Sequence, residues 1–154
     1  MRLVVLEVTR GRTPWADEAA RLYLERIERM ARIEERALRP ADPGPDVARV
    51  REDEGRRLLA AVGPRDHVVV LDERGRGLDT EGFRALLARG DEAAVTRIVF
   101  LLGGAHGHAE STRARAQTLL SLSPLVLNHQ VARVVLLEQI YRGLTLLKGV
   151  PYHH

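Results

Sequence analysis

The chain has 154 residues, of which 45% are hydrophobic, and this size allows one domain to bury a core without disulfides or metals. It contains no cysteine, which excludes a disulfide framework, a cysteine-ligated metal site and a catalytic thiol. The apolar runs are too short to span a membrane, and Met1-Arg2-Leu3-Val4 indicates a strand rather than a signal peptide. We therefore expect a single domain over residues 1–154, located in the cytoplasm and without a membrane partner.

The net charge of +3 comes from 24 basic and 21 acidic residues that are unevenly distributed. Residues 1–96 hold 18 basic and 19 acidic side chains, whereas residues 97–154 hold six basic and two acidic ones. Of the 24 cations only Lys148 is a lysine, and arginine offers a planar, bidentate recognition of phosphate that lysine lacks. We expect an anionic partner to bind the C-terminal third.

The first part of the chain alternates between strand and helix patterns. Strands are expected at residues 2–8 and, more weakly, at residues 33–38. Thr13-Pro14 supplies an N-cap and a first-turn proline for a helix that runs to about Ala31. After a loop at residues 40–45, Asp46 caps a second helix, which Gly63-Pro64 ends.

The second part continues the alternation. Residues 68–71 and 98–102 are continuous apolar runs, typical of strands buried on both faces. The remaining segments predict turns at residues 72–77, a helix at 80–89, a short helix near 111–118, an edge strand with a connector at 119–127, and a long helix at 128–147. This order predicts an α/β fold with a parallel-rich sheet flanked by helices.

The second buried run leads directly into Gly103-Gly104-Ala105-His106-Gly107. Glycines at the carboxyl end of a strand admit close approach to the backbone, so a nucleotide-like ligand could bind there. The spacing differs from the dinucleotide fingerprint and no Walker lysine follows. A tight strand-to-helix turn is an equally good interpretation of this loop taken alone.

Two further motifs are more specific. One is the helix segment with His129, Arg133 and Glu138-Gln139-Ile140-Tyr141-Arg142, and the other is the terminal Pro151-Tyr152-His153. Together with Trp15, Leu71-Asp72 and the glycine loop, they resemble the ribosomal RNA large-subunit methyltransferase H family of the SPOUT class across the whole chain. The resemblance implies a deep trefoil knot near residues 100–127, a rare exception to the rule against knotted chains.

The resemblance also implies an activity, S-adenosylmethionine-dependent methylation of N3 of a pseudouridine in 23S rRNA. S-adenosylmethionine would lie between three loops, and the residues expected to bind it are Leu71, Gly103, Gly104, Ser121, Leu122, Ser123, Leu125, Val126 and Leu127. The chain departs from the family at His106 and His108, which are either an added phosphate contact or, as we favour, a neutral replacement.

The catalytic candidates are Arg142, Tyr152 and His153. The resemblance makes Arg142 a contact to a phosphate or to the target base, while Tyr152 and His153 could stack on the base or accept its proton. We interpret His129 as an anchor of a knot loop. Arg133 and Glu138 are interpreted as members of structural ion pairs, and no metal is expected.

The expected partner is ribosomal RNA, either in the large subunit or in the assembled ribosome. A homodimer is also expected, because the helix at residues 128–147 is apolar on more than one side. Two alternatives remain open: a non-catalytic RNA-binding module that uses the basic C-terminal third, and a nucleotide-binding oxidoreductase built on the glycine loop.

Overall fold

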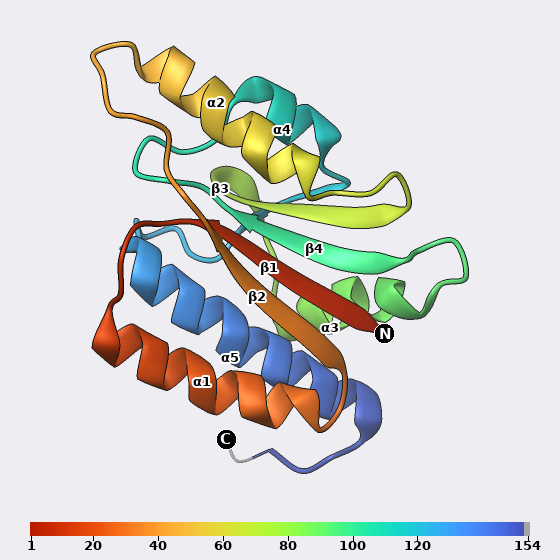
Figure 1. The fold of residues 1–154 in the computed structure, drawn as a ribbon. Coiled ribbons are helices and arrows are strands. Elements are labelled where there is room, and N and C mark those ends of the chain that lie inside the picture. The colour runs from red at the N-terminus through yellow and green to blue at the C-terminus, as the bar shows by residue number, and fades with distance from the viewer. Residues whose placement is uncertain (153–154) are drawn as a thin grey trace.

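The computed structural model describes residues 1–152. Within them, five strands form one sheet in the order β2-β1-β4-β3-β5, and each neighbouring pair is parallel (Figure 1). The strands are β1 (Arg2–Val8), β2 (Arg32–Leu38), β3 (Asp66–Gly77), β4 (Arg97–Leu102) and β5 (Thr118–Ser121). The helices are α1 (Pro14–Glu28), α2 (Val47–Ala60), α3 (Thr80–Ala88), the short 3-10 helix η1 (Arg89–Asp91), α4 (Glu110–Arg115) and α5 (His129–Lys148). This architecture confirms the predicted α/β class.

Helices cover both faces of the sheet (Figure 1). On one face, side chains such as Leu3 and Phe100 pack with α1, α3 and α5. On the other face, Leu6 and Leu101 pack with Leu58 of α2. Because side chains alternate along a strand, the continuous apolar runs serve two separate cores. Within residues 1–152, no helix has the length and apolar character needed to cross a membrane.

The turns predicted at residues 72–77 are only partly correct, because β3 continues to Gly77. Its pairing with β5 stops at Leu71 and resumes at Arg76, so residues 72–75 bulge out of the ladder. At Gly75 an added Cβ would lie 2.7 Å from backbone atoms of Leu119 and Leu120. Glycine therefore lets the bulge close against β5.

Two predicted helices are longer in the sequence interpretation than in the structure. The first ends at Glu28 rather than near Ala31, and the short helix near residues 111–118 covers only Glu110–Arg115. Thr118 instead begins β5, because it pairs with Val69 of β3. The Thr13 side chain caps no backbone group; its own N–H donates to the Asp17 carboxylate at 3.2 Å.

Strands β4 and β5 end beside the point where β3 leaves its ladder. Leu71 of β3 is in register with Leu102 of β4 and with Leu120 of β5. In an open parallel sheet, the loops that leave such carboxyl ends form the usual ligand site. The sheet thus brings three segments, separated in sequence, to one edge.

Candidate functional site

A cavity of about 600 Å³ opens where β4 and β5 end beside the bulge of β3. It is bounded by the bulge after Leu71, the glycine loop after Leu102, the segment after Leu120 and the first turn of α5. The structure brings all nine expected cofactor-binding residues to its wall. They are Leu71, Gly103, Gly104, Ser121, Leu122, Ser123, Leu125, Val126 and Leu127.

The wall combines apolar side chains with backbone polar groups. Leu125 and Val126 are 75% and 77% exposed, which is unusual for adjacent large apolar residues beside a cavity. The Ser121 hydroxyl donates to the Ser123 carbonyl oxygen at 2.9 Å, and the Leu125 N–H donates to the Ser123 hydroxyl at 2.9 Å. The segment after β5 is therefore held by its own hydrogen bonds while it presents apolar surface to a ligand.

Gly103 and Gly104 have no room for a side chain, because other side chains pack directly behind them. A Cβ at Gly104 would lie 2.7 Å from Oε1 of the buried Glu54, and a Cβ at Gly103 would lie 3.1 Å from the His108 ring. Any larger side chain would push the loop away from this support. The glycines thus keep bare backbone at the floor of the cavity.

His129, at the start of α5, ties the loop to the sheet. Its Nδ1 lies 3.1 Å from the Gly103 carbonyl oxygen, and its Nε2 lies 3.0 Å from Oε2 of Glu7. Both partners are acceptors when Glu7 is ionised, so making both bonds requires a proton on each ring nitrogen or on the Glu7 carboxyl. This geometry confirms the interpretation of His129 as a loop anchor.

Arg133, one turn further along α5, is the centre of a buried ion network. It donates to Glu35 at 2.8 and 2.6 Å and to Asp17 at 2.7 Å, and it lies 3.7 Å from Glu7. The hydrogen bonds to Glu35, followed by that to Asp17, outweigh burial and raise the pKa of Arg133. The structural role predicted for Arg133 is confirmed.

The two histidines of the glycine loop differ in environment. His106 is exposed and its carbonyl oxygen accepts from Arg51 Nε at 2.7 Å. His108 is 4% exposed, and burial lowers its pKa more than the nearby Asp72 charge raises it. A neutral His108 ring therefore backs Gly103, and its Nε2 has no hydrogen-bond partner within residues 1–152.

The catalytic candidates Arg142 and Tyr152 form a second cluster with Glu138. The Tyr152 hydroxyl donates to Glu138 Oε1 at 2.9 Å, and Arg142 donates to the same oxygen at 2.8 Å. The Tyr152 ring also lies edge-on to Tyr141 with centroids 4.7 Å apart, and the Arg142 guanidinium lies 4.5 Å from the Tyr152 centroid. Burial, followed by the Glu138 hydrogen bond, raises the pKa of Tyr152 to about 12. His153 lies outside the described residues.

This second cluster does not line the cavity. Along α5, Arg142 follows His129 by thirteen residues, which corresponds to about 20 Å at the helical rise. In Figure 1 the described residues that follow α5 turn back beneath α1, at the end of α5 opposite its first turn. In one copy of the chain, the cofactor candidates and the catalytic candidates are therefore apart.

Sequence reasoning missed Glu7, whose buried carboxylate connects His129 to the sheet. The available signal was an acidic residue within the otherwise apolar run at residues 3–8. It also missed the cationic rim of the cavity, where Arg113 donates to Asp72 at 2.6 Å and Arg51 and Arg74 stand nearby. Residues 1–152 contain no group of three histidine or acidic side chains suited to a metal ion.

Comparisons with known proteins place the whole chain among methyltransferases. A family model described as predicted SPOUT methyltransferase matches residues 1–153. A ribosomal RNA large subunit methyltransferase H from Nitratidesulfovibrio vulgaris (strain DP4) is 44% identical over 153 residues, covering 99% of this chain and 97% of that protein. The protein of the same name from Geotalea daltonii is 38% identical over 154 residues and 100% of both chains.

Among solved structures, the SpoU methyltransferase AviRb from Streptomyces viridochromogenes, in complex with AdoMet, is 16% identical with a TM-score of 0.41. The match covers 91% of this chain and 56% of that chain, and it is too weak to add an argument. The family model and the full-length relatives are sufficient: the chain belongs to the SPOUT methyltransferase family.

Proposed function

We propose that the protein transfers a methyl group from S-adenosylmethionine to N3 of a pseudouridine in 23S rRNA. The observation that supports this proposal most directly is the cavity of about 600 Å³ beside the bulge of β3 and the carboxyl ends of β4 and β5. Family membership and the names of the full-length relatives support methylation of large-subunit ribosomal RNA. The choice of N3 of pseudouridine rests on the resemblance of the Arg142 helix and the Tyr152 tail to that family.

The cavity residues fit S-adenosylmethionine in size and chemistry. The volume lies within the range of roughly 300–1,000 Å³ that is common for ligand sites. Leu71, Leu122 and Leu125 can contact the faces of the adenine, while backbone N–H and C=O groups of the glycine loop can meet polar edges. When bound, the cofactor supplies a methyl group already activated on a sulfonium, so the reaction needs no metal.

The residues of the chain would act mainly by positioning. Holding two reactants in line contributes roughly 7–11 kcal/mol, whereas a general base adds about 10² to 10⁴ in rate. The Glu7–His129 pair fixes the Gly103 carbonyl at the cavity floor. Tyr152, with its raised pKa, keeps its proton near neutral pH and would donate a hydrogen bond or stack on a base rather than act as the base.

We further propose that the active form is a homodimer. The separation of about 20 Å between His129 and Arg142 along α5 can be bridged if one protomer brings its Arg142 and Tyr152 to the cavity of its partner. Helices α1 and α3 already cover much of α5, but Val131 and Leu146 of α5 and the following Val150 remain exposed. These apolar side chains are available to an interface. Light scattering near 17.2 kDa at micromolar concentration would contradict the dimer.

Three expectations accompany this function. The protein would act in the cytoplasm, where its ribosomal RNA substrate is found. Residues 1–154 would form one domain, and the segment near residues 100–127 would form the deep trefoil knot of the family. A knotted segment would hold the glycine loop and the segment after β5 against each other, so that no movable loop is needed to close the cavity.

The deciding experiment incubates the protein with methyl-labelled S-adenosylmethionine and ribosomes, and in parallel titrates it with S-adenosylhomocysteine by calorimetry. Leu71→Arg should abolish cofactor binding and methylation together, because it places a charge in the apolar wall of the cavity. Leu22→Arg, at an exposed position of α1, is the matched control and should retain both. Absence of S-adenosylhomocysteine binding by the wild-type protein, or binding of a nicotinamide cofactor in its place, would refute the proposal.

A further inference from the structure

The end of the sheet opposite the cavity carries a row of arginines. Register pairs Arg2 of β1 with Arg32 of β2, and Asp66 of β3 with Arg97 of β4. The pairing of Leu3 with Ile98 places Arg2 beside Arg97 as well. Because residues in register on parallel strands point to the same face, the side chains of Arg32, Arg2, Arg97 and Asp66 lie abreast across four strands.

The only acid in this row is already neutralised. Asp66 is buried, which would raise its pKa, but hydrogen bonds from Arg97 and from the Gly63 N–H hold the pKa below the ordinary value. Arg97 donates to Asp66 Oδ1 at 3.1 Å, and Arg115 adds a second cation by donating to the Gly63 carbonyl oxygen at 2.8 Å. The carboxylate of Asp66 is therefore not free to pair with Arg2 or Arg32.

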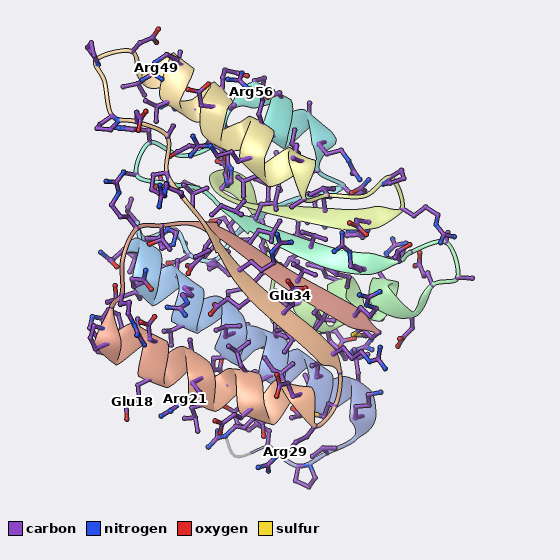
Figure 2. All side chains as sticks on the ribbon, in the orientation of Figure 1. Glu18, Arg21, Arg29, Glu34, Arg49 and Arg56 are labelled. Carbon is purple, nitrogen blue, oxygen red and sulfur yellow. The ribbon has the colours of Figure 1, made fainter. Side chains whose placement is uncertain are left out.

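Three arginines at this end remain exposed. Figure 2 shows Glu34 on the face of β2 turned toward the viewer, and Glu34 pairs with Arg36 at 3.4 Å. That leaves Arg2, Arg32 and Arg65 exposed and without a salt-bridge partner among residues 1–152. An arrangement of adjacent, unpaired guanidinium groups repels itself, so it is expected to bind an anion.

The row borders a hollow of about 260 Å³. Its lining consists of Arg2, Gly63, Pro64, Arg65, Asp66, Thr96 and Arg97. It contains none of the large exposed apolar side chains of the molecule, so it lacks the apolar anchor that a protein partner would need. With strands about 4.8 Å apart, the unpaired Arg2 and Arg32 lie side by side, and Arg65 borders the same hollow as Arg2, so the free charge is extended rather than a point.

We propose that the amino-end arginine row, which consists of Arg2, Arg32 and Arg97 with the neighbouring Arg65, is a second contact surface for the ribosomal RNA substrate. It would bind the sugar-phosphate backbone. Arginine presents a planar fork that matches phosphate oxygens bidentately, and a line of such forks matches consecutive phosphates. The inference rests on the proposed function and deepens it. The cavity would act on the target nucleotide, while the row holds a distant stretch of RNA without reading its sequence.

The test measures binding of 23S rRNA over a series of salt concentrations. Each neutralised phosphate contributes roughly 0.7 to 0.9 to the slope of log affinity against log salt. The triple variant Arg2→Gln, Arg32→Gln and Arg65→Gln should therefore lower the slope by about 2 to 3. Arg97 stays unchanged, because its loss would leave the buried Asp66 unpaired.

A matched control removes the same charge elsewhere. Arg21 of α1, Arg29 directly after α1 and Arg56 of α2 are exposed (Figure 2), and their replacement by Gln should leave the slope unchanged. The triple variant Arg2→Lys, Arg32→Lys and Arg65→Lys should keep the wild-type slope, because the salt effect depends on charge. Thermal melting of each variant checks that it is folded.

The outcomes separate this inference from the proposed function. If the glutamine triple binds 23S rRNA with the wild-type slope while S-adenosylhomocysteine still binds, the row is not an RNA contact and the proposed function stands. If the triple weakens binding to 70S ribosomes without lowering the salt slope, the row contacts a protein and the RNA assignment is overturned. If the wild-type protein binds neither S-adenosylhomocysteine nor rRNA, the proposed function itself fails.

Discussion

Replacing Arg133 with methionine should destabilise the fold more than any surface change. The guanidinium is 8% exposed and is the shared partner of Glu35, Asp17 and Glu7. Methionine has a similar length and no charge, so it fills the space but leaves the carboxylates of Glu35 and Glu7, at 11% and 4% exposure, without that cation. A buried charge without its partner is the main source of the expected loss.

The expected cost is about 3 to 5 kcal/mol of unfolding free energy, the usual result of breaking a buried ion pair. For a chain of this size, each kcal/mol shifts the melting temperature by about 2–4 °C, so Tm should fall by roughly 6–20 °C. The exposed pair of Arg89 with Glu92 offers the control. Both side chains are about half exposed, so Arg89→Met should cost about 1 kcal/mol or less.

The assay is urea denaturation followed by circular dichroism, with thermal melts at the same protein concentration. A loss for Arg133→Met no larger than that for Arg89→Met would show that the network is not a determinant of stability. The variant should also weaken S-adenosylhomocysteine binding, because Glu7 is shared between Arg133 and His129 and His129 holds Gly103. Unchanged affinity would separate the network from the cavity.

Three further predictions concern the bulge, a buried histidine and the tail. Gly75→Ala should weaken S-adenosylhomocysteine binding by about fivefold or more, because overpacking against the β5 backbone costs about 1–3 kcal/mol. Gly77→Ala, with open space around it, should bind as the wild type in the same titration. Burial lowers the pKa of His108 below 6.5, so its neutral form stabilises the fold fully above that pH and this stability falls as the pH drops toward the folded-state pKa. Urea denaturation of His108→Gln should therefore show a smaller loss from pH ~7 to pH ~5 than the wild type, and an equal loss would contradict the assignment. Deleting residues 152–154 should abolish methylation of ribosomes while S-adenosylhomocysteine affinity stays near wild type, since Tyr152 does not line the cavity; retained methylation would make the tail purely structural.

The sequence alone was sufficient for the alternation of strands and helices. Residues 2–8 and 98–102 carry their strand pattern locally, and α5 has a local start at Asn128, whose side chain accepts from the Gln130 N–H. Resemblance to a known family, rather than periodicity, indicated which loops would form the cavity. No local pattern predicted that Tyr152 is held by Glu138 and Tyr141.

Tertiary structure decided every feature that depends on distant pairing. β3 extends to Gly77 because it resumes pairing with β5, a partner some 45 residues further along the chain, and no local pattern specifies that contact. Arg133 meets Asp17 and Glu35 only because α5 packs beside α1 and the sheet. The charge balance of residues 1–96 gave no sign of a basic surface, yet strand register aligns Arg2 and Arg32 with Arg97 from another part of the chain. Local periodicity determines where the helices and strands form. Which charged side chains cluster, and where a cavity opens, depends on which of these elements become neighbours in the fold.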